Sequence, residues 1–306
     1  MKILNLILFV TLLSACQNNS SEMNNTSKEI DWQGHRGARG LLPENTIPSF
    51  LKALEYPVKT LELDVVVSKD NEIIISHEPW FSAHFCSKPD SSFITSQDEK
   101  NLLIMEMAYE EIKTYDCGSR GNENFPEQKK MKVFKPSLKD MVSSIESYCS
   151  TNNRELPFYN IEIKSQTSYY DTLVPNPSNF VQLILEAIKE TGIYNRCNLQ
   201  SFDINVLNEI HKQDPKIPVA YLIETLKSFE ENLKLLDFAP DIYSPYHIFV
   251  NEELVKNVHA KNMKLIPWTV NEVERMKELI DLGVDGIITD YPNRIDLAVS
   301  EDNKQN

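Results

Sequence analysis

Carboxylate side chains occur at spacings that would gather them at the ends of strands. Glu62 and Asp64 lie two residues apart in an apolar run, and Glu162 stands in the same relation to Lys164. Uncompensated carboxylates on one buried strand face repel each other, so a cation is expected beside them. An all-oxygen donor set suits Ca²⁺ or Mg²⁺ better than zinc. We therefore predict one divalent cation at Glu62, Asp64 and Glu162, although an ion pair with Lys164 would also explain Glu162.

A histidine and an arginine lie in the segment 34–40, which holds three of the chain's eight glycines. His35 and Arg36 would present a proton carrier and a guanidinium beside backbone that an oxyanion can approach closely. The segment lacks the lysine and the glycine spacing of nucleotide-binding loops. His77 is the second histidine of interest. Taken alone, His35 is as readily a structural histidine as a functional one, and a lone His77 is more often structural. Together with the carboxylates, Arg36 and Lys164 they indicate a catalytic site.

Weaker candidates end other expected strands. Trp268 and Gln200 are predicted to line the pocket, although a tryptophan in a barrel strand is at least as often a core residue. Glu224 and Asp290 are further candidates for contacts with the substrate or with the site residues.

The elements that would position these residues alternate between short apolar strands and helices. Eight strand-like runs separated by helical patterns predict an α/β fold, a TIM-type (β/α)8 barrel spanning residues 31–298. The runs are 33–35, 61–67, 158–163, 198–201, 219–223, 242–244, 264–268 and 286–289.

Helix signals occur where this barrel needs them. Asn45 or Thr46 is expected to cap a helix that ends near residue 54, which explains most of the segment 43–46. Asn271 and Glu274 form a capping-box pattern, and Gly283 is expected to end that helix.

One strand-like run, 72–77, follows the second strand too closely for a parallel crossover and should return as a hairpin. With the turn centred on Asp70 and Asn71, Asp64 is expected directly opposite His77. Residues 79–135 then form an irregular segment with scattered aromatic residues. We expect a small inserted subdomain after the second strand that covers the mouth of the barrel.

The N-terminal residues have the pattern of a targeting segment. Residues 1–16 comprise Lys2, an apolar run too short to span a bilayer and a small-residue pair before Cys16. This pattern resembles a bacterial lipoprotein signal, so we expect lipidation of Cys16; an ordinary signal peptide with a chance cysteine is the alternative. Residues 17–30 read as a flexible linker, and residues 299–306 as a polar tail. We expect a lipid-anchored protein of the cell envelope, outside the cytoplasm, on its periplasmic or surface face.

Four further cysteines bear on that location. In an oxidising compartment some could pair, and Cys86 with Cys117 is the favoured pair because both lie in the irregular segment. Buried free thiols are an equally good reading. Their spacing matches no zinc motif.

The overall charge narrows the class of partner. The 306 residues carry a net charge of −14, and lysine and arginine form no long run, which disfavours nucleic acid as a partner. An acidic chain that handles an anion must neutralise it locally, by a few placed cations or a metal. The sequence carries no signal for an oligomeric state.

In combination, these motifs resemble those of the glycerophosphodiester phosphodiesterase family. The resemblance runs from residue 32 to residue 291, apart from the insert, and its elements keep their order. They are the His-Arg-Gly at 35–37, Pro-Glu-Asn-Thr at 43–46, Glu-Leu-Asp at 62–64, His77, Glu-Ile-Lys at 162–164, Trp-Thr-Val-Asn at 268–271 and the segment 283–290. The residue after the second histidine is commonly Asp in the family and is Glu78 here.

Membership would imply a TIM-type barrel that hydrolyses glycerophosphodiesters to sn-glycerol 3-phosphate and an alcohol with a divalent cation. Carried over position by position, the resemblance gives metal ligands at Glu62, Asp64 and Glu162, an acid/base pair at His35 and His77, and phosphate-binding groups at Arg36 and Lys164. We expect His35 to be the base and His77 the acid.

Two other functions stay open. A relative could act on lysophospholipids or sphingolipids as a phospholipase D-like or cyclising phosphodiesterase, with the membrane anchor holding it near its substrate. The chain could also be a non-catalytic lipoprotein that binds glycerophosphodiesters. Paired histidines favour an enzyme over a binding protein, which needs no proton carriers.

Overall fold

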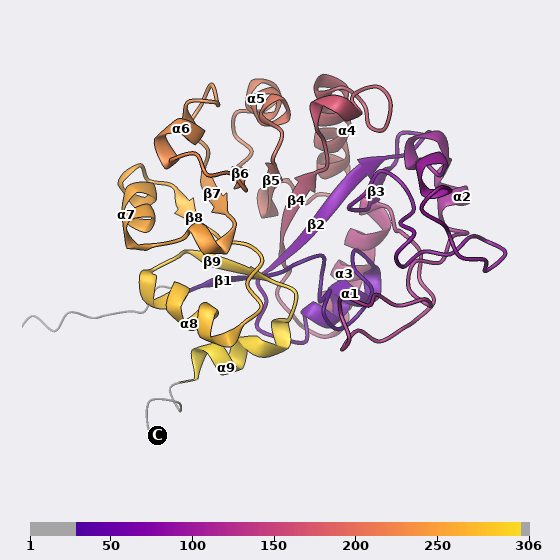
Figure 1. The fold of residues 1–306 in the computed structure, drawn as a ribbon, viewed down its shortest axis with the longest axis horizontal. Coiled ribbons are helices and arrows are strands. Elements are labelled where there is room, and N and C mark those ends of the chain that lie inside the picture. Colours follow the sequence, from indigo (N-terminus) through magenta and orange to yellow (C-terminus); the bar gives the residue numbers. More distant parts are fainter. Residues whose placement is uncertain (1–28, 301–306) are drawn as a thin grey trace, which may run out of the picture.

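The computed structural model describes residues 29–300, and its eight parallel strands are surrounded by helices (Figure 1). Cys16, the signal segment, the linker up to residue 28 and the end of the tail lie outside the described residues. The parallel strands are β1 (Asp31–Gly34), β2 (Thr60–Val67), β4 (Phe158–Ile163), β5 (Cys197–Ser201), β6 (Val219–Ile223), β7 (Ile242–Pro245), β8 (Lys264–Leu265) and β9 (Gly286–Thr289). The predicted TIM-type barrel is confirmed.

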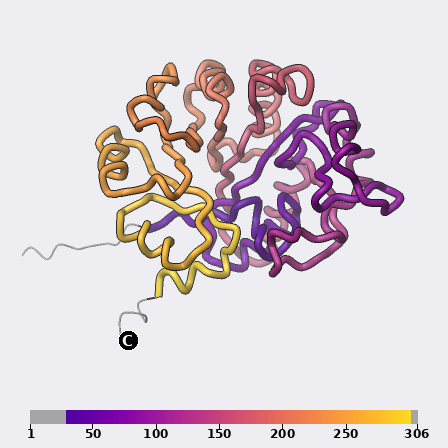
Figure 2. Tube along the Cα trace, in the orientation of Figure 1, coloured from indigo at the N-terminus to yellow at the C-terminus, as the bar shows by residue number. Residues whose placement is uncertain are grey.

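The strands pair in the order β8-β7-β6-β5-β4-β2-β1-β9. Beyond the short β8, the amide of Ile288 donates to the carbonyl of Pro267 at 3.0 Å, and the amide of Val270 donates to the carbonyl of Ile288 at 2.9 Å, which joins the two ends of the sheet. The tube in Figure 2 shows the indigo start of the barrel, β1, beside its yellow end, β9, with which it pairs in parallel.

A helix follows each parallel strand. These helices are α1 (Ile47–Ala53), α3 (Leu138–Thr151), α4 (Pro177–Glu190), α5 (Ile204–Gln213), α6 (Phe229–Leu233), α7 (Glu252–Ala260), α8 (Val273–Leu282) and α9 (Ile295–Val299). Thr46 caps α1, and Gly283 ends α8 in the left-handed conformation at φ 87°. The expected capping box at Asn271 and Glu274 is wrong, because α8 begins after Glu272 and Asn271 bonds to Asp290 instead.

The strand β2 shows how the sequence pattern divides the barrel wall. All its residues are buried, and the side chains of Leu61, Leu63 and Val65 join the main hydrophobic core. Glu62 and Asp64 alternate with them and therefore lie on the opposite face, inside the barrel. The period-two argument for these two carboxylates is confirmed.

The hairpin after β2 forms, but in a different register from the predicted one. β3 (Ile73–Ile75) pairs antiparallel with β2, with Val65 opposite Ile75. The amide of Ser76 then donates to the carbonyl of Asp64 at 2.9 Å, so Ser76 and not His77 lies opposite Asp64. The turn is one residue tighter than we expected.

The insert occupies residues 76–136, between β3 and α3, and carries the short helix α2 (Tyr109–Ile112) beside β2 and β3 (Figure 1). The predicted disulfide joins Cys86 to Cys117, and Cys149 and Cys197 are buried free thiols. The insert packs on the loop after β1, where Gln128 Nε2 donates to the carbonyl of Arg39 at 2.8 Å. Within residues 29–300 no helix is long and apolar enough to span a membrane.

Candidate active site

Three carboxylates from two neighbouring strands meet inside the barrel near the carboxyl ends of the strands. Asp64 of β2 is in register with Glu162 of β4, and Glu62 lies two residues before Asp64, on the same face of β2. One oxygen of each carboxylate lies within 4.8 Å of the others. All three side chains are buried, and Asp64 is 0% exposed. The structure therefore brings together the three predicted metal ligands.

Cations and amides surround this cluster without filling it. Lys164 Nζ lies 2.6 Å from Glu162 Oε1 and 3.8 Å from Asp64 Oδ1. Arg36 Nε lies 3.1 Å from Asp64 Oδ2. The ion pair considered for Glu162 and Lys164 is present, but the Oδ1 atom of Asp64 is buried without a hydrogen-bond partner. Such an oxygen, beside two other carboxylates, fits a hard divalent cation.

The pKa values of the clustered carboxylates also show that their negative charges are not fully compensated by the protein. Burial, followed by repulsion from Asp64 and Glu162, raises the pKa of Glu62 well above its ordinary value. Burial also acts to raise the pKa of Asp64, but Arg36, His77 and Lys164 outweigh it and hold that pKa well below the ordinary value. The surroundings thus raise the pKa of one carboxyl group and lower the pKa of its neighbour. A divalent cation would stabilise the ionised form of both.

His35, directly after β1, is held by a carboxylate at the end of the neighbouring strand β9. Its Nδ1 lies 2.6 Å from Asp290 Oδ1, just after β9. Burial acts to raise the pKa of Asp290, but His35 and Arg39 lower it overall, so the group is a carboxylate and Nδ1 of His35 must carry the hydrogen. Burial lowers the pKa of His35 despite Asp290. His35 is therefore neutral near pH 7, with Nε2 free to accept a proton.

His77 is held in the same way by the residue that follows it. Its Nδ1 lies 2.7 Å from Glu78 Oε1. Burial opposes ionisation of Glu78, but the hydrogen bond and charge of His77 lower its pKa, so this carboxylate also accepts from Nδ1. Glu78, the position that departs from the resemblance, thus contacts His77 and is not part of the three-carboxylate cluster. Nε2 of His77 remains available for proton transfer.

The segment 43–46 does more than cap a helix. Glu44 Oε1 accepts from Arg36 Nη1 at 2.7 Å, and Glu44 Oε2 accepts from Arg39 Nε at 2.7 Å. Asn45 adopts a positive φ of 56° and its Nδ2 donates to Asp64 Oδ2 at 2.8 Å. Sequence reasoning missed both roles. The signal available was the sequence position, because Glu44 and Asn45 follow the His35 loop directly.

Of the weaker candidates, Gln200 and Trp268 line the site cavity and Glu224 does not. Gln200 Nε2 donates to Glu62 Oε1 at 2.9 Å, and the indole of Trp268 donates to the carbonyl of Ser244 at 2.9 Å. The side chain of Glu224 is exposed. The remaining histidines of the described residues lie outside that cavity as well. They are His84, His211, His247 and His259.

These groups share one cavity of about 150 Å³ at the mouth of the barrel. Its lining includes both histidines, two of the three carboxylates and both predicted phosphate-binding cations. They are His35, His77, Glu62, Glu162, Arg36 and Lys164. Asp64 lies beneath them, with no exposed surface of its own. The fold and the site together define an α/β-barrel enzyme equipped to bind a phosphate ester and to move protons at it.

Comparison with known proteins gives the family. Residues 35–294 match the model of the Glycerophosphoryl diester phosphodiesterase family, and the chain belongs to that family. It is 29% identical over 265 residues to a glycerophosphodiester phosphodiesterase of Caldanaerobacter subterraneus, which covers 85% of this chain and 94% of that one.

Solved structures agree on the fold. A protein from Silicibacter pomeroyi, described as a glycerophosphoryl diester phosphodiesterase, matches with a TM-score of 0.77 and 27% identity over 89% of this chain and 95% of that one. An Oleispira antarctica phosphodiesterase, solved with the product sn-glycerol-3-phosphate, matches with a TM-score of 0.68 and 22% identity, covering 88% of this chain and 96% of that one.

Proposed function

We propose that this protein hydrolyses glycerophosphodiesters to sn-glycerol 3-phosphate and an alcohol, using His35 and His77 as its proton carriers. The observation that carries the proposal is the matched pair of histidines. Each imidazole donates a hydrogen bond from Nδ1 to a carboxylate, Asp290 for His35 and Glu78 for His77. Both imidazoles line the cavity that Arg36, Lys164 and two of the three clustered carboxylates also line. A protein that only binds a diester has no use for two such oriented imidazoles.

The residues of the chain have separate tasks in this reaction. Arg36 and Lys164 bind the phosphate and offset the charge that grows on its oxygens. His35, buried and neutral, removes a proton through Nε2 from the nucleophile, which is water or the 2-hydroxyl of the glycerol. The protonated Nε2 of His77 gives its proton to the oxygen of the departing alcohol. The P–O bond to the alcohol breaks as the bond to the nucleophile forms.

Glu62, Asp64 and Glu162 are the residues that would hold the single divalent cation, Ca²⁺ or Mg²⁺. Both ions prefer oxygen donors, and Ca²⁺ tolerates the irregular geometry of three carboxylates and water better than Mg²⁺. When bound, the cation supplies Lewis-acid stabilisation of the phosphate oxygens. Gln200 and Asn45 fix the orientation of two of the ligands through their amide groups.

The decisive experiment measures release of sn-glycerol 3-phosphate from glycerophosphocholine by the purified protein. We expect turnover with Ca²⁺ or Mg²⁺ and none in excess chelator. Mass spectrometry of the first product distinguishes attack by water from attack by the 2-hydroxyl, because the latter forms a cyclic phosphate first. Tight binding without turnover would establish a binding protein instead. Selective cleavage of lysophospholipids would establish the phospholipase D-like alternative.

Two variants separate the proton carriers from the metal ligands. His77→Ala should abolish turnover without weakening the affinity for the cation, because His77 Nδ1 bonds to Glu78 and His77 gives no ligand atom to the cluster. Glu62→Gln should weaken both. Isothermal titration with Ca²⁺ and with Mg²⁺ measures the affinity in each variant. Equal loss of metal affinity in the two variants would contradict these roles.

We also propose that the protein acts in the cell envelope on a lipid anchor at Cys16. The disulfide between Cys86 and Cys117 supports an oxidising compartment, since such bridges are rare in the cytosol. The proposal otherwise depends on the sequence pattern of residues 1–16.

A further inference from the structure

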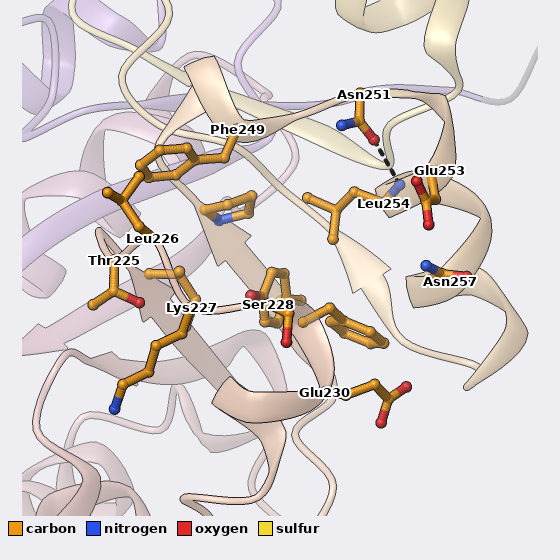
Figure 3. A pocket seen from close by; sticks show the side chains of 14 residues that line it. Thr225, Leu226, Lys227, Ser228, Glu230, Phe249, Asn251, Glu253, Leu254 and Asn257 are labelled. Atoms are coloured by element: carbon orange, nitrogen blue, oxygen red, sulfur yellow. Dashed lines mark hydrogen bonds between the residues drawn. The ribbon is translucent and has the colours of Figure 1, made fainter.

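Three larger cavities lie around the barrel, and only one of them continues the active site. One, of about 420 Å³ beside Ser68 and Asn179, shares no lining residue with the site cavity. The cavity between α6 and α7, shown in Figure 3, has a volume of about 430 Å³ and is lined by residues such as Leu226, Phe249 and Glu253. It shares no lining residue with the site cavity. The third, the large cavity of about 610 Å³, shares four: His77, Glu162, Lys164 and Phe202.

The shared residues fix which part of a diester would occupy the large cavity. Lys164, the proposed phosphate ligand, lines both cavities, so a bound phosphate would lie where they join. His77 lines both, whereas His35 lines only the small one. If His77 gives its proton to the departing alcohol, that alcohol extends into the large cavity. The glycerol, next to His35, then occupies the small cavity.

The chemistry of the large cavity is aromatic and acidic. Trp80 and Tyr169 line it with their ring centroids 6.2 Å apart in an edge-to-face arrangement, and Phe202 lines the side nearest the site. Asp203 contributes a buried carboxylate, and Glu78 contributes a partly buried one beside His77. Aromatic faces and unpaired negative charge are the two features that attract an organic cation.

The positive charge in this cavity is already neutralised. Among the described residues that line it, Lys164 is the only lysine or arginine, and its ammonium bonds to Glu162 at 2.6 Å. Asp203 accepts hydrogen bonds from the hydroxyls of Ser165 and Tyr170, which are neutral donors, and caps α5. All three groups that donate to its carboxylate are uncharged, and none of the ion pairs found within residues 29–300 includes it. An alcohol carrying a positive charge would supply an ionic partner.

We propose that the large cavity is the subsite for the departing alcohol and that it selects a positively charged one, with a quaternary or primary ammonium. Trp80, Tyr169 and Phe202 would contact the cation through their ring faces, and Asp203 would supply the opposite charge. The inference rests on the proposed function, because it takes the phosphate to bind at Lys164 and the alcohol to leave toward His77.

The test compares diesters that differ only in the charge of the alcohol. Glycerophosphocholine and the 3,3-dimethylbutyl ester of glycerol phosphate have nearly the same shape, but carbon replaces the charged nitrogen in the second. We expect kcat/KM to favour the choline ester by about tenfold, the size of one partly desolvated cation–aromatic contact. Glycerophosphoethanolamine serves as the primary-ammonium arm and should also exceed the neutral ester.

Variants assign the preference to this cavity. Asp203→Asn removes the charge and keeps an oxygen for the cap of α5, since Asn caps helices as well as Asp. Trp80→Leu removes an aromatic face. Each should reduce the ratio of kcat/KM for the choline ester to that for the neutral ester by at least about threefold. Glu253→Gln, an exposed charge in the cavity between α6 and α7, is the matched control and should leave the ratio unchanged.

Because each ratio is measured within one protein preparation, partial loss of folded protein does not affect it. A wild-type ratio near one, or an unchanged ratio in both Asp203→Asn and Trp80→Leu, would overturn the inference. So would a preference for glycerophosphoinositol or glycerophosphoglycerol over both cationic esters. In all these cases the neutral esters still release sn-glycerol 3-phosphate, so the proposed function stands. Release from none of the esters would instead overturn the proposed function, and this inference with it.

Discussion

The hydrogen bond between His35 and Asp290 allows a sharp test of the assigned proton transfers. In the Asp290→Asn variant, Asn271 decides how the new amide lies. Its Nδ2 donates to Asp290 Oδ2 at 2.8 Å, so the amide oxygen is held on that side and the amide NH2 faces His35 Nδ1. Nδ1 must then become an acceptor, which moves the hydrogen of the neutral ring to Nε2. The base loses the lone pair that it needs.

The loss should be large because the bond is short and buried. The Nδ1 to Oδ1 distance is 2.6 Å, and the side chains of His35 and Asp290 are 11% and 5% exposed. We expect kcat/KM for glycerophosphocholine to fall by about 10³-fold, equivalent to about 4 kcal/mol of transition-state stabilisation. In a serine protease, the wrong tautomer of the general base lowers kcat by about 10⁴-fold, so a loss of at least 10³-fold is reasonable here.

The assay is the pH profile of kcat/KM with saturating cation, and a second histidine–carboxylate pair provides the control. His259 Nε2 lies 2.8 Å from Oδ2 of Asp285, the residue directly before β9, and this pair lies outside the site cavity. Asp285→Asn changes the same chemical group and should alter kcat/KM by less than about threefold. Retention of activity by Asp290→Asn within the same margin would refute the assignment of His35 as base. A matched fall in both variants, accompanied by lower Tm, would attribute the loss to folding.

Three further predictions concern stability and location. Burial opposes the charge of Glu44, but Arg36 and Arg39 hold its pKa below the ordinary value of 4.5, so its carboxylate stabilises the fold above that pH and less so as the pH falls below it. The Tm difference between wild type and Glu44→Gln should shrink between pH 7 and pH 3; a constant difference would contradict it. Replacing Cys86 and Cys117 by serine opens a loop of 31 residues and should cost about 3–4 kcal/mol in urea unfolding, a loss that added reductant reproduces in the wild type. Cys16→Ser should abolish fatty-acid labelling and release the protein from the membrane fraction, whereas persistent labelling would exclude this cysteine as the anchor.

Much of the barrel could be predicted because its strands carry two signals at once. In β2, alternation of leucine with Glu62 and Asp64 gives both the strand and the face that each residue occupies. The same pattern in β4 places Glu162, and parallel pairing brings it level with Asp64. These three residues are far apart in sequence, but parallel strands in one barrel end at the same face.

The contacts that orient the site could not be predicted in the same way. Asp290 was a weak candidate at a strand end, and only the pairing of β9 with β1, the last strand with the first, brings it to His35. Asn271 was assigned to a helix cap that does not form, because its amide has a better partner in Asp290. An asparagine can cap a helix or bond to a distant side chain, and sequence rules for caps see only the first possibility. The contact with Asp290 in the folded chain decides which of the two occurs.

His77 reaches the site for a reason different from the one the sequence suggested. A register shift of one residue moves every side chain of a strand to the other face of the sheet. Because Ser76 and not His77 pairs with Asp64, the argument that placed His77 beside Asp64 no longer holds. The chain leaves β3 at Ile75, however, and Ser76 Oγ donates to the carbonyl of Glu78 at 2.5 Å. Lys135, at the far end of the insert, donates from Nζ to the same Ser76 hydroxyl at 2.8 Å. The turn that presents His77 is thus fixed from both ends of the insert, which makes the insert part of the catalytic scaffold as well as a wall of the alcohol cavity.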